Sequence, residues 1–287
     1  QPVPHRGGFG VPTRPRSATR QHQLISDEWV HDQAAAVIGK VSAARATWGI
    51  NHVRAETQRM LRYTDHVADQ AVAGRIIETA LGVHSIALTT HADTEMGEPG
   101  ELRRADGSSI YRRHDSTIYT SEDVLAAERR ILAAAGMAGG HIVDNDSIET
   151  ALAERLALDG VELNDGQALL LRDMATSGAR LQVALAPAGT GKTTAAAPLA
   201  SAWITSGGTV IGLAPTAAAA EVLAADLGAP TDTIDKLVHL AGLGGGPKAA
   251  ADDPAHAWFD HIDERTLIIV DEAGMASTAG LDAVVAH

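Results

Sequence analysis

The segment Leu181–Thr194, which reads LQVALAPAGTGKTT, constrains the fold of this 287-residue chain more than any other. A short apolar run leads into a glycine-rich turn, and the turn delivers Lys192 and Thr193 to the start of an alanine-rich helix. Backbone N–H groups and the positive end of the helix dipole converge at such a point and attract an anion. The pattern is that of a phosphate-binding loop (P-loop), with Ala186 where the usual pattern begins with glycine.

The P-loop pattern predicts a role for each of its residues. Lys192 is expected to reach the β- and γ-phosphates of ATP, and the Thr193 hydroxyl is expected to ligate Mg²⁺. The glycines allow the backbone to curl tightly enough to aim its amides at a phosphate. The predicted cofactors are therefore ATP and Mg²⁺, and the predicted nucleotide-binding residues are Ala188, Gly189, Thr190, Gly191, Lys192, Thr193 and Thr194.

A second acidic motif lies downstream, in the segment Thr266–Met275, which reads TLIIVDEAGM. Its apolar residues predict a strand buried on both faces, and such a strand presents the following residues at the carboxyl edge of the sheet. There Asp271 can hold Mg²⁺ through water, and Glu272 can orient and deprotonate an attacking water. Adjacent acids after the strand favour hydrolysis of a nucleotide over transfer to a small acceptor.

Strands and helices alternate from residue 161 onwards, which predicts an α/β fold with a parallel sheet flanked by helices. This region is expected to be a P-loop NTPase domain. The predicted helices are residues 164–177, 192–205, 217–227 and 233–240, and the predicted strands are residues 181–185, 209–214 and 266–270.

The first half of the chain has a different pattern. Residues 1–24 are rich in proline and arginine and are expected to be a disordered lead-in. Residues 25–150 are expected to be a mainly helical region, and residues 151–287 form the predicted ATPase domain. Apolar spacing predicts helices over residues 27–41 and 52–81, short strands within 83–90 and 108–120, and two further helices capped by Thr120 and Asp146. Three arginines in the second helix, Arg54, Arg59 and Arg62, fit either a solvated face or a nucleic-acid contact.

Charge and cysteine content exclude several classes of site. The chain has a net charge of −13 and no cysteine, which excludes disulfides and thiolate metal sites and permits a reducing cytoplasm. Residues 151–287 hold 17 acidic and 7 basic side chains, which argues against non-specific binding to duplex DNA through a basic patch. The 13 histidines show no metal-binding pattern, and no apolar run is long enough for a membrane span.

Gln167 precedes the predicted P-loop strand, near the start of a helix. Its amide could pair with the N6 and N7 edge of adenine, because glutamine uses this bidentate geometry for that base.

The motifs taken together resemble the RecD/TraI branch of superfamily 1 DNA helicases. The resemblance rests on LNDGQALLL, APAGTGKTT, IGLAPTAAAAEVL and LIIVDEAGM. Upstream, HVRAETQRML and RADGSSIYRRHDSTIYTSEDVLAAERRILAAAG resemble the region between the nicking and motor domains of TraA/TrwC-type conjugative relaxases. The resemblance implies a RecA-like domain in which Gln167 contacts adenine, while Pro215 and Thr216 contact single-stranded DNA. It also implies that this chain is an internal piece of a longer protein, with weak hydrolysis of its own.

Two other functions fit the sequence. Residues 25–150 could make the chain a non-catalytic module that docks single-stranded DNA or other relaxosome proteins. A small-molecule P-loop kinase is the third reading, and it would require turnover stimulated by a metabolite and indifferent to DNA.

Overall fold

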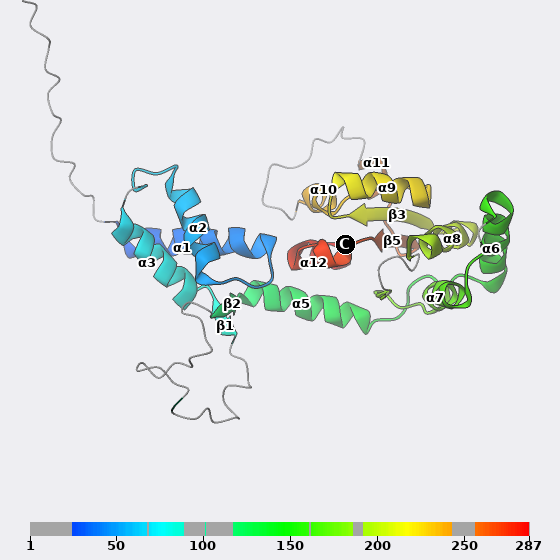
Figure 1. Cartoon of the computed structure of the whole chain (residues 1–287), viewed down its shortest axis with the longest axis horizontal. Helices are drawn as coiled ribbons and strands as arrows, with labels where there is room; N and C mark the ends of the chain where they lie inside the picture. Colours follow the sequence, from blue (N-terminus) through cyan, green and yellow to red (C-terminus); the bar gives the residue numbers. More distant parts are fainter. Residues whose placement is uncertain are drawn as a thin grey trace, which may run out of the picture.

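The computed structural model describes residues 25–67, 69–88, 101, 117–160, 162–185, 192–242 and 256–286 of the chain. A bundle of helices forms one end of the elongated molecule, and a parallel sheet with its own helices forms the other (Figure 1). The helix of residues 122–135 runs between the two ends (Figure 1).

The helical end, called the helical region below, is built from α1 (Asp27–Ala44), α2 (Ile50–Leu61), α3 (Gln70–Gly82) and the start of α5 (Glu122–Ala135). Its core forms because each helix has an apolar stripe at helical spacing. In α1 the stripe is Val30, Ala34, Val37, Ile38 and Val41, all buried. These residues pack in one cluster with apolar residues of α2 and α3 and with Val124 of α5.

The helical stretch predicted over residues 52–81 is two helices, α2 and α3, so the prediction of one long helix was wrong. The Thr64 hydroxyl donates to the carbonyl of Leu61 at 2.9 Å, where α2 ends. The Asp69 carboxylate then accepts from the N–H groups of Ala71 and Val72 and caps α3. Side chains that bond to nearby backbone in this way compete with a continuous helix. The turn allows both helices to pack against α1.

A small antiparallel hairpin joins the helical region to α5. Strand β1 (Ile86–Leu88) pairs with β2 (Ile118–Thr120), with Ile86 opposite Thr120. Residues 83–85 and 117, which the predictions included, are not strand, and residues 89–90 and 108–116 lie outside the described residues. The prediction that Thr120 caps the next helix was wrong. Its hydroxyl donates to the carbonyl of Ala46 at 2.9 Å, and the neighbouring Ser121 accepts from the N–H of Val124 as the cap of α5.

Helix α6 (Asn145–Asp159) begins two residues earlier than a cap at Asp146 would allow. Asp144 is the cap, because its carboxylate accepts from both the N–H and the hydroxyl of Ser147 at 2.8 Å. These two hydrogen bonds lower the pKa of Asp144 below its usual value, because they favour the ionised form. The helix ends at Gly160, which adopts the left-handed conformation (φ 63°), as the sequence predicts.

The lowered pKa of Asp144 makes the stability of the chain depend on pH. A carboxyl group whose pKa is lower in the folded state contributes stability above its unfolded pKa, and this contribution is lost as the pH falls through the folded pKa. Asp144→Asn keeps a cap acceptor but cannot titrate, so its unfolding midpoint should change less between pH 7 and pH 3 than that of wild type. Urea denaturation at both pH values measures the difference, and equal pH dependence in the two proteins would contradict it.

The other end of the molecule contains the predicted α/β fold. Its three strands, β3 (Thr209–Ala214), β4 (Thr231–Thr233) and β5 (Thr266–Val270), pair in the order β4-β3-β5 and are all parallel. The helices around them are α7 (Asp165–Thr176), α8 (Lys192–Thr205), α9 (Ala217–Leu227), α10 (Ile234–Leu240), α11 (His256–Phe259) and α12 (Thr278–Ala286), with a 3₁₀ turn η2 at Ala273–Met275. The structure thus has a parallel sheet flanked by helices, as a P-loop NTPase domain requires.

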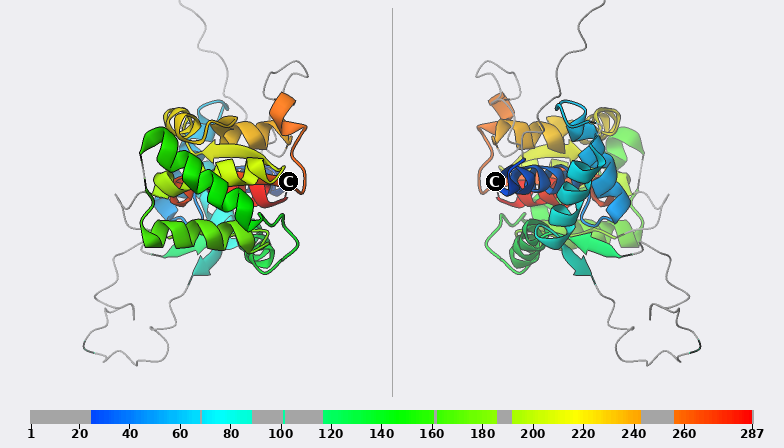
Figure 2. Two further views of the ribbon diagram at one scale, coloured as in Figure 1. Left: turned by 90° about the vertical axis from the view of Figure 1, so that its right-hand side faces the viewer. Right: turned by 90° about the vertical axis from the view of Figure 1, so that its left-hand side faces the viewer.

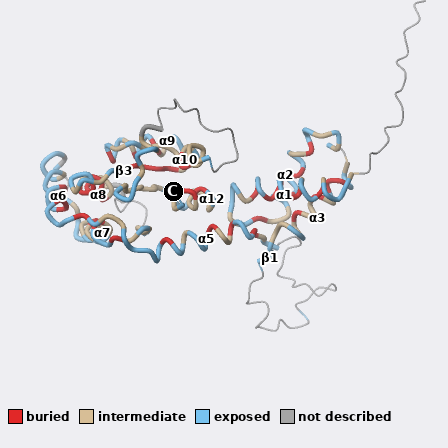
Figure 3. The backbone as a smooth tube through the Cα atoms, turned by 180° about the vertical axis from the view of Figure 1, so that it is seen from behind, coloured by how far each residue is buried: buried red, intermediate tan, exposed pale blue. Residues whose placement is uncertain are grey.

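Helices cover both faces of this sheet (Figure 2). Val210 of β3 and Leu267 and Ile269 of β5 pack in a cluster with α6, α7, α8 and α9. Ile211 and Ile268 point the other way and pack with α10, α11 and α12. Strands buried on both faces need apolar residues at every position, which explains the uninterrupted apolar runs. Strand β3 is the most deeply buried of the three (Figure 3).

The predicted strand at residues 181–185 is not part of the sheet. Val183 is 74% exposed and Leu185 is 92% exposed, and no backbone hydrogen bond among the described residues joins this segment to β3 or β5. The segment is tethered elsewhere, because the Arg180 N–H donates to the carbonyl of Met137 and the Gln182 amide donates to that of Met174, both at 3.0 Å. An apolar run becomes a strand only where it can pair with the edge of another strand. These bonds hold the segment away from the sheet, so the prediction of a strand was wrong.

Helices α5 and α12 connect the two ends of the molecule. Arg130 of α5 donates to both carboxylate oxygens of Asp282 of α12, at 2.9 and 2.6 Å. The Asp282 side chain is only 16% exposed, and its hydrogen bonds to Arg130, together with its charge, raise the pKa of Arg130. At the far end of α12, Arg180 donates to the carbonyl of Val285 at 3.2 Å.

Candidate nucleotide site

The acidic pair Asp271 and Glu272 follows β5 directly, at the carboxyl edge of the parallel sheet. The N–H of Asp271 donates to the carbonyl of Leu213 at 3.0 Å, which fixes Asp271 beside the end of β3. Asp271 is half-buried and Glu272 is exposed. One carboxylate is therefore held at the sheet, and the next projects into solvent.

Glu272 adopts the left-handed conformation (φ 50°, ψ 37°), and it is the one non-glycine residue with positive φ among the described residues. This conformation costs about 1–2 kcal/mol for a residue with a Cβ atom. Local hydrogen bonds hold it, since the Glu272 N–H donates to Asp271 Oδ1 at 2.9 Å and its carbonyl accepts from Met275 at 2.8 Å. Backbone strain of this kind concentrates at functional sites.

Helix α8 packs against the sheet whose carboxyl edge carries the acidic pair. Its last turn lies at the opposite edge, because the Trp203 indole donates to the carbonyl of Arg265 at 2.8 Å, just before β5 begins. The helix has 14 residues and is about 21 Å long. The 6 residues of β3 span about 20 Å, so a helix of this length can reach from one edge of the sheet to the other. We therefore expect the first residue of α8, Lys192, to lie near the carboxyl edge, as the P-loop pattern predicts.

Part of the predicted P-loop lies outside the described residues. This is so for Ala186, Ala188, Gly189, Thr190 and Gly191, and also for the side chains of Lys192 and Thr193. Thr194, in the first turn of α8, is half-buried. The roles predicted for these residues remain predictions.

The two residues predicted to contact DNA, Pro215 and Thr216, follow β3 at the carboxyl edge. Thr216 caps α9, since its hydroxyl accepts from the N–H of Ala219 at 3.2 Å. Its side chain is exposed, and Pro215 is half-buried. Both residues lie at the same edge of the sheet as the acidic pair. The Thr216 hydroxyl has a structural function there, because it caps a helix.

Gln167 also has a structural function that the sequence analysis did not predict. Its side-chain oxygen accepts from the N–H of Asn164 at 3.1 Å, while Asn164 accepts from the N–H of Gln167 at 3.0 Å. This reciprocal capping box begins α7, which packs against α8. A capping signature of Asn followed three residues later by Gln could have revealed it. The adenine contact stays a prediction.

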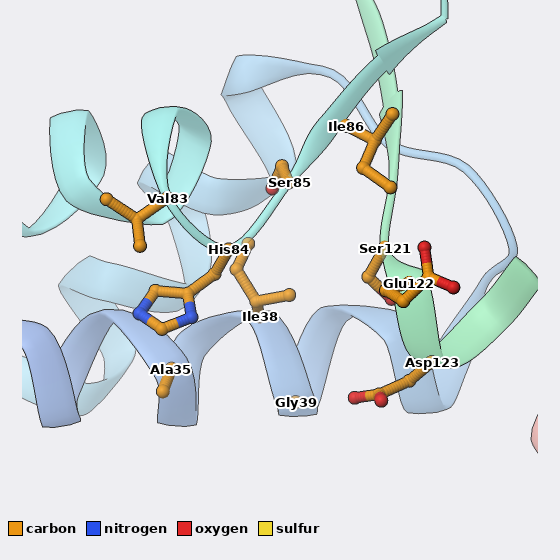
Figure 4. Close-up of a pocket in the computed structure, with 10 residues that line it drawn as sticks. All are labelled: Ala35, Ile38, Gly39, Val83, His84, Ser85, Ile86, Ser121, Glu122 and Asp123. Atoms are coloured by element: carbon orange, nitrogen blue, oxygen red, sulfur yellow. The ribbon is translucent and has the colours of Figure 1, made fainter. Parts of the chain in front are cut away.

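A cavity of about 280 Å³ lies in the helical region, between α1, the start of β1 and the start of α5, away from the sheet edge (Figure 4). Its polar lining comes from His84, Ser85, Glu122 and Asp123. Burial and the nearby His31 lower the pKa of His84, which favours a neutral ring. Glu122 forms an ion pair with Arg129 at 2.5 Å. The cavity has no part in the candidate nucleotide site.

Comparison with protein families finds a match in the sheet-containing part of the chain. Residues 162–287 match the family model of an AAA domain. No curated protein shows significant similarity to the chain. The AAA match and the parallel sheet support a nucleotide-binding P-loop domain of the helicase type in this part of the chain.

Two further properties concern the described residues alone. No group of three or more His, Asp and Glu side chains in them is arranged to hold a metal ion. None of the helices in that part of the chain combines the length and the apolar character needed to cross a bilayer.

Proposed function

We propose that residues 151–287 form an ATPase domain that binds Mg-ATP at the carboxyl edge of the sheet and hydrolyses it. One observation carries the proposal: Asp271 and Glu272 follow β5 at the carboxyl edge of the sheet, and α8, whose last turn is bonded at the opposite edge, is long enough to bring its N-terminus to them. A helix N-terminus favours phosphate, and a carboxylate opposite it favours the metal that accompanies the phosphate.

The described residues fit Mg-ATP. Asp271 offers an oxygen ligand, because its Oδ1 accepts from a backbone N–H and its Oδ2 has no hydrogen-bond partner among the described residues. Mg²⁺ prefers oxygen ligands and is usually bound by one or two carboxylates together with substrate phosphates. Lys192 would hold the phosphates, and Thr193 and Asp271 would hold the metal. When bound, the metal neutralises charge that develops on the phosphates.

Glu272 would act as the base in hydrolysis. Its exposed carboxylate can accept a proton from water and orient that water toward the terminal phosphate. Because Asp271 is anchored to β3 by its N–H, the metal ligand and the base are held at adjacent positions. Gln167 is proposed to contact adenine, as the resemblance to superfamily 1 helicases implies.

The wider role is that of a motor on single-stranded DNA. In this proposal the chain is the N-terminal RecA-like part of a cytoplasmic conjugative relaxase-helicase, with Pro215 and Thr216 against the DNA backbone. The AAA match supports the helicase type, and the resemblance of residues 45–287 to relaxase-helicases supports the conjugative role. Residues 25–150 would lie between the nicking and motor domains and could contact other relaxosome proteins.

Hydrolysis with and without DNA tests this function against its alternatives. We expect slow Mg-dependent ATP hydrolysis that an oligodeoxythymidylate accelerates and a panel of small metabolites does not. Turnover stimulated by a metabolite and indifferent to DNA would support the kinase reading. If the folded protein neither binds nor hydrolyses a nucleotide, the non-catalytic interaction module would be the remaining function.

A further inference from the structure

Helix α12 begins a few residues after Glu272 and packs together with the chain on both sides of the acidic pair. The apolar cluster on this face of the sheet contains Val270, the last residue of β5, and Ala276, which follows η2. Leu281 and Val284 of α12 pack in the same cluster. The backbone is thus fixed to this cluster just before and just after the acidic pair, and the position of Glu272 depends on where α12 lies.

Helix α12 is held from two sides. Towards the sheet, Gly280 is buried, and a Cβ atom there would come within 3.0 Å of Ile234 Cγ2 in α10, so the glycine allows the two helices to lie close together. Asp282 is two residues further along, which places it on nearly the opposite side of α12. There α5 packs along α12, and its Arg130 binds the Asp282 carboxylate (Figure 1).

The ion pair of Arg130 and Asp282 has a geometry that fixes the orientation of one helix against the other. Nε and Nη2 of Arg130 donate to different oxygens of the carboxylate, at 2.9 and 2.6 Å. A planar guanidinium group bound to a carboxylate through two bonds sets direction as well as distance. The neighbouring Arg129 differs, because it pairs with Glu122 of its own helix and both side chains are well exposed. Its ion pair therefore leaves α12 unaffected.

We propose that Arg130 is a positioning residue for ATP hydrolysis: by binding Asp282 it fixes α12, and α12 fixes the turn that carries Glu272. This inference rests on the proposed function, in which Glu272 is the base. The left-handed backbone of Glu272 is unfavourable for a residue with a Cβ atom, and such a conformation persists only where its surroundings hold it. Displacement of a general base slows the chemical step and leaves the ligands of the phosphates and the metal in place.

Single-turnover hydrolysis and calorimetric titration with Mg-ATP test the effect on the reaction. Arg130→Gln should lower the rate about tenfold, since a misplacement of about 1 Å can cost up to 10²-fold. The affinity for Mg-ATP should stay close to that of wild type. Arg130→Lys keeps the charge without the two-bond geometry, so its rate should lie between those of wild type and Arg130→Gln. The control Arg129→Gln makes the same change of charge in the same helix and should hydrolyse ATP as wild type does.

Hydrogen exchange of the full chain without nucleotide tests the positioning independently of activity. The Met275 N–H donates to the Glu272 carbonyl at 2.8 Å, and the Ala276 N–H donates to the Ala273 carbonyl at 3.1 Å. In Arg130→Gln the amides of Met275 and Ala276 should exchange about fivefold faster or more, because the turn opens locally. The amides of β3 should exchange as in wild type.

The outcomes separate this inference from the proposed function. Unchanged exchange at Met275 and Ala276 in Arg130→Gln, or equal acceleration in β3, would overturn the positioning role, since the second result shows a general loss of stability. Wild-type hydrolysis by Arg130→Gln beside slow hydrolysis by Glu272→Gln would overturn it as well and leave the proposed function intact. Wild-type hydrolysis by Glu272→Gln would remove both the proposed base and the inference that depends on it.

Discussion

Replacing Glu272 with glutamine is expected to lower the rate of ATP hydrolysis about 10²–10⁴-fold, the usual contribution of a general base. Glutamine has nearly the same shape but cannot accept the proton of the attacking water. The affinity for Mg-ATP should change little, because the proposed phosphate and metal ligands are Lys192, Thr193 and Asp271. Single-turnover hydrolysis of radiolabelled ATP measures the rate, and titration calorimetry measures the affinity.

Glu264→Gln is the control for this prediction. Glu264 is an exposed acid just before β5, at the opposite edge of the sheet from Glu272. Its replacement makes the same change of charge and should leave hydrolysis unaffected. A Glu272→Gln protein that hydrolyses ATP within twofold of the wild-type rate would remove Glu272 from the proposed mechanism.

Replacing Trp203 with alanine is expected to lower the free energy of unfolding by about 3–5 kcal/mol, the usual cost of deleting a buried tryptophan. Trp203 is 7% exposed and packs in the cluster that joins α8 to the sheet. Its ring meets His141 edge-on at 5.1 Å, and its indole N–H donates to the carbonyl of Arg265. The substitution removes apolar packing and one of the two donors to that carbonyl, which keeps the N–H of Thr209 at 3.2 Å.

Trp203→Phe separates these two contributions. It keeps most of the packing and loses the hydrogen bond, so we expect a loss of about 1–2 kcal/mol. Urea denaturation followed by circular dichroism measures both variants. A midpoint for Trp203→Ala equal to that of wild type would show that Trp203 does not anchor α8, and the argument that places Lys192 at the carboxyl edge would lose its support.

The elements that build the candidate site were predictable because several signals agree in them. Helix α8 and strands β3 and β5 have the predicted boundaries. In β5, the apolar run 267–270 ends abruptly at Asp271, and α9 has the predicted range and ends at Gly228 in the left-handed conformation. Local preference and burial favour the same structure in these segments.

The errors occurred where tertiary contacts or a neighbouring polar side chain decided the outcome. Residues 181–185 have the composition of a strand, but their anchors hold them away from the sheet. Asp144 and Ser121 cap helices that other capping patterns assigned to Asp146 and Thr120. The short strand β4 was not predicted, because Thr231–Thr233 has no apolar pattern. It is a strand because it pairs with β3, which lies beside it.

The account depends most on Lys192 and the acidic pair serving one nucleotide, and titration of the full chain with Mg-ATP by calorimetry tests this directly. We expect wild type to bind Mg-ATP with one site, and Lys192→Ala to lose at least tenfold in affinity while unfolding at the wild-type urea concentration. Asp271→Asn should weaken binding in the presence of Mg²⁺ and have little effect on binding in EDTA. No binding by wild type, or equal affinity for wild type and Lys192→Ala, would contradict the account.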